Sequence, residues 1–296
     1  MTAAPDRSGL VVVDKPAGWT SHDVVGRVRR LAGTRRVGHA GTLDPMATGV
    51  LVVGVERATR LLGRLALTDK EYDATIRLGA ATTTDDAEGE VTSRAAVDAV
   101  HDDAVERAVA ALTGTISQVP SSVSAVKVDG RRAYERVRSG EEVTLAAREV
   151  TVSRFDVARS VRADDGSSLD LDVHLECTTG TYVRALARDL GAALGVGGHL
   201  TRLRRTRVGP FALARARTLD ALAERFELMP MDEAGAFAFP RRDVDGDTAR
   251  VLSHGGRLPA TGAEGPVAVY GPDGVFLALV EDRAGWAKPL AVFAPG

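Results

Sequence analysis

The chain has 296 residues, of which 44% are hydrophobic and 26% are charged, and its formal net charge is −2. This composition is ordinary for a globular protein, and the length suits one large domain or one large and one small domain. No apolar run approaches the roughly 20 residues of a membrane helix, and the N-terminus lacks the basic and apolar segments of a signal peptide. We therefore expect a cytosolic protein with no membrane partner.

Hydrophobic patterns in the first part of the chain predict both strands and helices. Strands are predicted at residues 9–14, 50–55 and 72–78, the last from strict apolar–polar alternation. Helices are predicted after a cap at Thr20 or Ser21 as far as Gly33, at residues 58–65 and at residues 97–112. Residues 35–49, which lie between the first helix and the second strand, form a loop rich in glycine and arginine.

The pattern in the rest of the chain predicts more strands and one further change. Near Pro240 the sequence changes to short apolar runs separated by turn residues. The predicted elements are a strand at residues 125–128, a turn at 129–130, a basic helix at 131–140, a strand at 169–177, and a helix within TTGTYVRALARDLG. Short apolar runs separated by turns then indicate a small all-β module. We expect an α+β fold with a largely antiparallel sheet and flanking helices in residues 1–240, and a separate module in residues 241–296.

Charge is unevenly distributed along the chain. Five arginines and no acid lie between Asp23 and Asp44, and six arginines and no acid lie between Asp189 and Asp220. The segment from Asp85 to Arg107 carries eight acids and two arginines. This segregation favours a polyanion-binding face with a solvated acidic face behind it.

The loop sequence VGHAGTLDPMATG contains one aspartate, Asp44, beside the basic run. The loop lacks the lysine of a P-loop, and neither G-x-G-x-x-G nor G-x-S-x-G is present. Asp44 is thus a candidate nucleophile or general base, and the alternative is an aspartate that shapes the turn before Pro45. A buried carboxylate needs a nearby cation to stay ionised, and Arg184 near the start of the predicted helix is a candidate.

Cysteine and histidine usage does not indicate zinc. The chain has one cysteine, Cys177, which we expect to point into the core, and six histidines without metal-binding spacing. A magnesium site built from carboxylates alone is left open.

Six stretches together resemble the bacterial TruB family, the tRNA pseudouridine-55 synthases. They are GLVVVDKPAGWTSHDVV, RRVGHAGTLDPMATGVLVVGV, DKEYDATIRLGAATTTDDAEG, VPSSVSAVKVDGRRAYERVRSG, CTTGTYVRALARDLG and LRRTRVGPF. The resemblance runs in the same order from residue 9 to about residue 235, and the C-terminal part more weakly resembles the family's PUA-like RNA-binding module.

The resemblance implies the pseudouridine synthase fold and an isomerase that acts on the T arm of tRNA. Asp44 then matches the catalytic aspartate, and the reaction requires no metal or cofactor. The carboxylate could attack C1′ of the uridine, attack C6, or remove the 2′ proton, and the sequence leaves these routes open. The sequence implies no protein partner, and we expect a monomer by default.

The resemblance also assigns residues around Asp44. Tyr72 matches a tyrosine that stacks on the target base, Arg184 matches the arginine that pairs with the aspartate, and Tyr182 and Leu203 match residues of the uridine pocket. His39 matches the residue that fills the gap left by the extruded base. Lys15 is a candidate at the pocket edge. Candidates for contact with RNA phosphates are Arg35, Arg36, Lys127, Arg131, Arg132, Arg204 and Arg205.

Two other functions compete with this prediction. A tRNA-binding or tRNA-folding protein would use the same basic surfaces, but it would have no need for the set Asp44, Tyr72 and Arg184. A phosphohydrolase with Asp44 as the nucleophile is disfavoured because no second acid lies within a few residues to hold Mg²⁺.

Overall fold

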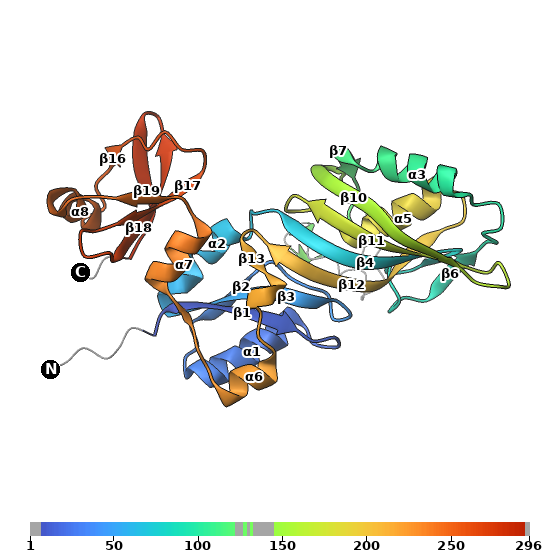
Figure 1. Ribbon diagram of the computed structural model, residues 1–296, viewed down its shortest axis with the longest axis horizontal. Helices are drawn as coiled ribbons and strands as arrows, with labels where there is room; N and C mark the ends of the chain where they lie inside the picture. The colour runs from blue at the N-terminus through green and yellow to red at the C-terminus, as the bar shows by residue number, and fades with distance from the viewer. Residues whose placement is uncertain (1–6, 122–126, 129–130, 133–144, 294–296) are drawn as a thin grey trace. The chain divides into compact units, whose positions relative to one another are not determined.

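The computed structural model describes residues 7–121, 127–128, 131–132 and 145–293 (Figure 1). The chain folds into two compact units, of which the first combines Met1–Thr68 with Arg207–Gly296 and the second consists of Asp69–Thr206. The first unit is therefore built from both ends of the sequence.

The first unit contains a sheet that carries the strands of the N-terminal region. Its elements before the second unit are β1 (Gly9–Lys15), α1 (Ser21–Ala32), β2 (Val37–Ala40), β3 (Thr48–Val55), η1 (Glu56–Arg60) and α2 (Leu62–Leu65). Those that follow it up to Pro240 are β13 (Phe211–Ala212), η2 (Leu213–Arg215), α6 (Leu219–Glu224), β14 (Met229–Pro230) and α7 (Met231–Ala238). The strand order here is β14-β1-β3, and β2 also pairs with β3.

Strands β1 and β3 are apolar on both faces, and this explains their unbroken runs of valine and leucine. They pair antiparallel with Val12 opposite Val52. Val11 and Leu51 pack with residues of α1 and α6, whereas Val12 and Val52 pack with α2 and α7. The two helix pairs lie on opposite faces of these strands (Figure 1). The structure confirms the predicted buried strands at residues 9–14 and 50–55.

The first helix begins and ends where the sequence predicts. The Thr20 hydroxyl accepts a hydrogen bond from the Asp23 amide, and the Asp23 carboxylate accepts one from the Thr20 amide, which completes a capping box. The hydrogen bonds from Thr20 lower the pKa of Asp23. Gly33 closes the helix with φ of 66°, a left-handed conformation that glycine adopts without strain.

The C-terminal part of the first unit is a five-stranded sheet with order β15-β17-β18-β19-β16. Its elements are β15 (Arg241–Asp243), α8 (Gly246–Ser253), β16 (Leu258–Pro259), β17 (Pro266–Tyr270), β18 (Phe276–Arg283) and β19 (Trp286–Val292). Helix α8 corrects the expectation of an all-β module. The helix forms because Asp245 caps it by accepting a hydrogen bond from the Thr248 amide.

Aromatic residues of this C-terminal sheet share a core with the N-terminal strands. Phe276 and Phe293 stack with their ring centroids 4.9 Å apart, and both belong to the same buried cluster as Leu10 and Val52. The core thus contains residues from both sides of Pro240, where the composition of the sequence changes.

The second unit contains an antiparallel sheet with helices on one side of it (Figure 1). Its main strands follow the order β12-β4-β11-β10-β7. Its elements are β4 (Lys70–Leu78), β5 (Ala80–Thr82), β6 (Val91–Arg94), α3 (Asp102–Ala111), β7 (Gly114–Gln118), β8 (Lys127–Val128), β9 (Arg131–Arg132), β10 (Arg148–Arg162), β11 (Leu169–Cys177), α5 (Val183–Ala193) and β12 (Gly198–Val208). Buried residues alternate with half-buried or exposed ones along β4 and β11, and Cys177 points into the core as predicted. The α+β, largely antiparallel fold is confirmed.

Several predicted boundaries change. The helix predicted at residues 97–112 starts only at Asp102, and the one at 58–65 divides into η1 and α2. The first two residues of the predicted basic helix, Arg131 and Arg132, form a strand instead, paired with Lys127 and Val128. Its remaining residues, the predicted turn at 129–130 and residues 125–126 lie outside the described part of the chain. No helix of the described ranges combines the length and apolar character needed to cross a membrane.

Candidate active site

Asp44 lies in the loop that joins β2 to β3 in the first unit. The two strands pair antiparallel, with His39 opposite Val53 and Ala40 opposite Val52. The loop turns back at Asp44, whose carbonyl accepts a hydrogen bond from the Ala47 amide at 3.1 Å. Asp44 itself is half-buried. The carboxylate thus stands on a short connection between two paired strands.

Both neighbours of Asp44 are anchored through their backbone. The Ser21 hydroxyl accepts from the Leu43 amide at 2.9 Å and donates to the Leu43 carbonyl at 3.1 Å. The Pro45 carbonyl accepts from the Gly18 amide at 2.8 Å. These contacts hold the backbone on either side of Asp44 against the start of α1, and they restrict the conformations open to the carboxylate.

Lys15, the last residue of β1, contacts the same loop. Its side chain is fully buried, and its ammonium group donates to the carbonyls of Pro16, Trp19 and Pro45 at 3.0, 2.6 and 3.2 Å. The ammonium thus bonds to backbone carbonyls beside the Asp44 loop, and a place for Lys15 at the edge of a substrate pocket stays a prediction. Lys15 is a positioning residue of the Asp44 loop.

The second unit supplies the predicted aromatic and apolar candidates. Tyr72 on β4 is buried and pairs with Leu175 of β11, and Leu203 on β12 is buried as well. Tyr182 stands immediately before α5. The side chain of Gln118 clamps it by accepting from the Tyr182 amide at 2.8 Å and donating to the Tyr182 carbonyl at 3.1 Å.

Arg184 lies in the first turn of α5 and forms a buried ion pair with Asp86. Nη1 of Arg184 and Oδ2 of Asp86 are 3.5 Å apart, and the two side chains are 5% and 4% exposed. The same guanidinium nitrogen donates to the Thr84 carbonyl at 2.9 Å. Asp86 also accepts hydrogen bonds from the Thr84 hydroxyl and the Glu88 amide. Arg184 is therefore held in a fixed orientation by the loop after β5.

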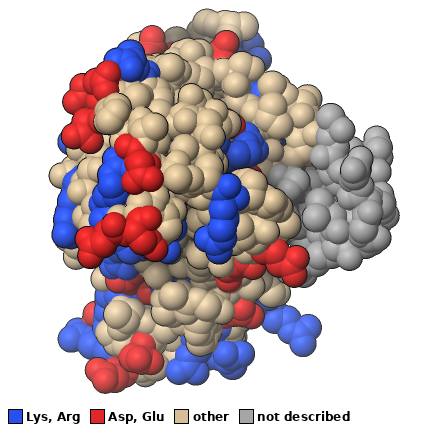
Figure 2. All heavy atoms as spheres, turned by 90° about the vertical axis from the view of Figure 1, so that its right-hand side faces the viewer, with Lys and Arg blue, Asp and Glu red and all other residues tan. Residues whose placement is uncertain are grey.

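Asp85, beside Asp86, faces a second arginine. Nη1 of Arg188 lies 3.4 Å from Oδ2 of Asp85, and burial raises the pKa of Asp85 despite the opposing effect of Ser121 and Arg188. The charge pattern of the sequence predicts a solvated acidic face that includes both aspartates, and this expectation is corrected, because both are buried. Figure 2 shows acidic and basic side chains intermixed on the face it presents.

Two basic residues of the second unit are buried: Lys70, the first residue of β4, and Arg205 on β12. Burial, together with the charge of Arg205, lowers the pKa of Lys70 to about 8. The expected contact between Arg205 and RNA phosphates is therefore wrong, because a side chain that is 1% exposed does not reach the surface. Alternation along β12 turns Arg205 to the core and leaves Arg204 half-buried.

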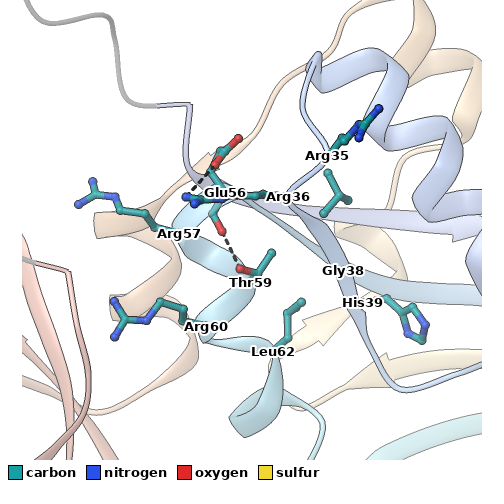
Figure 3. Close-up of a pocket in the computed structure, with 10 residues that line it drawn as sticks. Arg35, Arg36, Gly38, His39, Glu56, Arg57, Thr59, Arg60 and Leu62 are labelled. Carbon is teal, nitrogen blue, oxygen red and sulfur yellow. Dashed lines mark hydrogen bonds and ion pairs between the residues drawn. The ribbon is translucent and has the colours of Figure 1, made fainter.

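The other predicted RNA contacts have different positions. Arg35 and Arg36 are exposed immediately before β2 (Figure 3). Lys127, Arg131 and Arg132 belong to the β8–β9 ladder, and their side chains lie outside what the structure describes. Asp44 belongs to the first unit and Arg184 to the second, and their pairing stays a prediction.

Sequence reasoning missed three supporting residues: Asp86, Gln118 and Ser21. Their roles depend on contacts between distant segments, and a single sequence carries no signal for them beyond the polar residue types. Among the described residues, no group of three or more His, Cys, Asp and Glu side chains is arranged to hold a metal ion.

Models of known families cover most of the chain. The model described as TruB family pseudouridylate synthase (N terminal domain) matches residues 29–183. Models described as tRNA pseudouridylate synthase B C-terminal domain and as tRNA Pseudouridine synthase II, C terminal, match residues 184–235 and 239–294.

Individual proteins are similar over the whole length. A protein of Thermobifida fusca named tRNA pseudouridine synthase B is 62% identical over 97% of this chain and 98% of its own length. One of the same name from Streptomyces griseus is 62% identical over 99% of both chains. Among solved structures, a chain of a Cbf5-Nop10-Gar1 complex is 26% identical with a TM-score of 0.73, over 97% of this chain and 85% of that one. By the matches to its family models and to these relatives, the chain belongs to the TruB family of pseudouridylate synthases.

Proposed function

We propose that this chain isomerises uridine 55 in the T loop of tRNA to pseudouridine, with Asp44 as the catalytic carboxylate. The observation that carries the proposal is the Asp44 loop, in which the residues on both sides of one half-buried carboxylate are anchored by Ser21, Gly18 and Lys15. Relatives of this chain are named tRNA pseudouridine synthase B, and pseudouridine synthases are isomerases.

The reaction needs one well-placed group and no added atoms. The glycosidic bond between C1′ and N1 of the uridine breaks, the base rotates, and a bond forms between C1′ and C5. The proton that leaves C5 is balanced by one that returns to N1. A carboxylate serves this sequence as a nucleophile at C1′ or C6, or as the base that removes the 2′ proton. Each of these roles requires Asp44 to be held in a fixed position, which the anchored loop provides.

The proposal also assigns roles to residues of the second unit. Arg184 would pair with Asp44 and orient it, because a guanidinium holds a carboxylate through parallel hydrogen bonds. The buried pair with Asp86 keeps Arg184 in place for this role. Tyr72 would stack on the target base, while Tyr182 and Leu203 would line the uridine pocket.

A stacked uridine must leave the T loop before any carboxylate can reach it. Extrusion costs about a few kcal/mol, and a planar side chain in the vacated space offsets part of this cost. We assign that role to His39, which is half-buried on β2 immediately before the Asp44 loop.

We further propose that the chain acts in the cytoplasm as a monomer without a protein partner. In this proposal residues 1–240 carry the chemistry and residues 241–296 supply additional RNA-binding surface.

The test uses an unmodified tRNA transcript, the purified chain and EDTA. Pseudouridine is then labelled chemically and mapped by its mass shift, and we expect a single modified position at uridine 55. A transcript with cytidine at position 55 is the matched control and should stay unmodified. The absence of pseudouridine, or turnover that is lost in EDTA and restored by Mg²⁺ while the RNA stays folded, would contradict the proposal.

A further inference from the structure

Arg184 and Arg188 lie one turn apart on α5, on the same face of the helix, and each pairs with one of two consecutive aspartates. Nη1 of Arg184 lies 3.5 Å from Oδ2 of Asp86, and Nη1 of Arg188 lies 3.4 Å from Oδ2 of Asp85. Only the first pair has a role in the proposed function, although the side chain of Asp85 is only 12% exposed.

The loop after β5 holds both aspartates in fixed positions. Asp85 has φ of 60°, a left-handed conformation that is uncommon and strained for residues other than glycine. Its carbonyl accepts a hydrogen bond from the Leu200 amide at 3.0 Å, and the Asp86 carbonyl accepts one from the Gly89 amide at 3.3 Å. The Thr82 hydroxyl also donates to the Asp86 carbonyl, at 2.8 Å. The two carboxylates therefore meet the helix from one well-ordered backbone.

The guanidinium of Arg188 joins this loop to a second segment. Its Nη2 donates to the Val119 carbonyl at 2.7 Å, and its Nε donates to Oδ1 of Asp189 at 2.9 Å. With the contact to Asp85, each of its three nitrogens has a partner. A planar guanidinium spans several partners at once, whereas the compact ammonium of lysine acts as a point charge. Arg188 thus bridges the loop after β5 and the residue that follows β7.

Val119 comes directly after Gln118, the residue that clamps Tyr182. Gln118 is buried, and its side chain makes two hydrogen bonds with the Tyr182 backbone. Tyr182 in turn stands immediately before α5. The bridge at Arg188 therefore connects the loop that holds Arg184 to the strand end that holds Tyr182.

We propose that Arg188 is a positioning residue for the isomerisation, and that its bridge keeps Arg184 and Tyr182 in a fixed arrangement relative to each other. The inference rests on the proposed function, in which Arg184 orients the catalytic carboxylate and Tyr182 lines the uridine pocket. Arg188 needs no contact with RNA for this role. Its loss should slow the reaction because a misplacement of about 1 Å in a reacting group can cost about a hundredfold in rate.

The test compares Arg188→Lys, which keeps the charge and loses the planar group, with Arg188→Met, which loses both. Single-turnover pseudouridine formation is measured at saturating enzyme, together with tRNA affinity. We expect both variants to react about tenfold or more slowly than the parent, with affinity within about twofold. Arg77→Lys is the matched control and should keep the parental rate, because Arg77 pairs with Asp170 through two hydrogen bonds outside this network.

A second measurement does not depend on activity. The Tyr182 amide donates to Oε1 of Gln118, so its hydrogen exchange reports how firmly the clamp is held. In both Arg188 variants we expect this amide to exchange about tenfold or more faster than in the parent, while the amides of β1 and β3 keep the parental exchange rate.

Asp85→Asn weakens the other end of the same bridge and should also slow turnover. Combined with Arg188→Lys, it should lower the rate by no more than about twofold further, because residues that act as a unit are not additive. These two variants keep the test decisive if Arg188→Met is unstable in a thermal melt.

If the parent forms pseudouridine at uridine 55 but the Arg188 variants keep its rate and its Tyr182 exchange, this inference is wrong and the proposed function stands. A parental rate in Arg188→Lys would also contradict the bridge, because charge alone would then suffice. Lower stability without a change in rate would show that Arg188 has only a structural role. A parent that forms no pseudouridine would overturn the proposed function, and the exchange of the Tyr182 amide would still test the bridge.

Discussion

Arg184 and Asp86 form an ion pair inside the protein, where each charge depends on the other. The guanidinium nitrogen and the carboxylate oxygen are 3.5 Å apart and both side chains are almost fully buried. Removal of one partner from such a pair takes away a nearby opposite charge in a poorly solvated place, which is costly. The orientation of Arg184 and the stability of the second unit are therefore linked through Asp86.

We predict that Asp86→Asn lowers the free energy of unfolding by up to about 3–5 kcal/mol, because the Arg184 charge loses a buried counterion. Turnover should fall more than tRNA affinity, because Arg184 loses its fixed orientation. Urea unfolding and single-turnover kinetics measure the two effects. Asp170→Asn is the matched control, since Asp170 pairs with Arg77 at the surface and should cost at most about 1 kcal/mol. Equal effects of both substitutions would refute this view of the pair.

Lys70 provides a prediction about pH. Burial lowers its pKa from 10.5 to about 8, so between about pH 8 and 10.5 the unfolded chain binds more protons at this position than the folded chain. Stability contributed by this group therefore rises with pH across that window. Lys70→Met should be more stable than the parent below pH 8, by up to about 3 kcal/mol, and this advantage should shrink toward pH 10.5.

The measurement for Lys70 is urea unfolding of both proteins at several pH values. Lys288→Met is the control, because Lys288 is exposed and its replacement relieves no buried charge. An advantage of Lys70→Met that stays constant from pH 7 to 10.5 would contradict the assignment.

The position of a single residue can be predicted where the local sequence determines it. Arg184 was expected near the start of a helix and lies in the first turn of α5. Its partner Asp86 was not predicted, because the contact depends on how the loop after β5 meets α5. Burial of Arg205 was missed for a related reason: the arginine-rich run suggested a surface, but within β12 Leu203 and Arg205 are buried while Arg204 between them is half-buried.

At the scale of elements, α1 and the Asp44 loop behave as one piece. Ser21 at the start of α1 makes two hydrogen bonds with the Leu43 backbone. These bonds connect the helix cap to the residue next to Asp44. The start of α1 therefore sets the position of the proposed catalytic loop.

Ser21→Ala should lower turnover by about tenfold or more while tRNA affinity stays within about twofold, because the loop is loosened but no RNA contact is removed. The stability cost should be about 1–3 kcal/mol, since the Leu43 backbone groups lose a buried partner. Ser21→Thr retains the hydroxyl and should restore much of the turnover. A variant that loses stability but keeps the parental rate would show that Ser21 has only a structural role.

Local sequence signals predict the ends of some helices correctly but miss those of others. Thr20 and Gly33 mark the ends of α1 because capping chemistry is local to the chain. The helix expected from residue 97 begins later because Val97 and Val100 pack in the connection before α3. Helix α8 was overlooked among the short apolar runs, although Asp245 supplies a cap signal.

At the scale of the molecule, the first unit joins the two ends of the sequence through one core. Phe276 is 1% exposed and clusters with Leu10 and Val52. The change of composition near Pro240 predicted a boundary between two domains, and the assignment of separate roles to residues 1–240 and 241–296 stays a prediction. A core that forms across that point cannot be read from composition, because it depends on which apolar faces meet.

We predict that Phe276→Ala lowers the free energy of unfolding by about 3–5 kcal/mol. Hydrogen exchange should accelerate at the amides of β1 and β3 as well as those of β18, because the shared core links them. Val251→Ala removes an exposed side chain of α8 and should stay within about 0.5 kcal/mol of the parent. Faster exchange confined to β15–β19 would mean that the C-terminal sheet is energetically independent.

The most direct test of the account is the single-turnover rate of pseudouridine formation by Asp44→Asn with excess enzyme over tRNA. Asparagine keeps the size of the side chain and removes its charge. We predict no detectable pseudouridine at uridine 55, with tRNA affinity within about tenfold of the parent, or about 1.4 kcal/mol. A rate near that of the parent would contradict the account, because the anchored loop would then hold an aspartate that only shapes a turn.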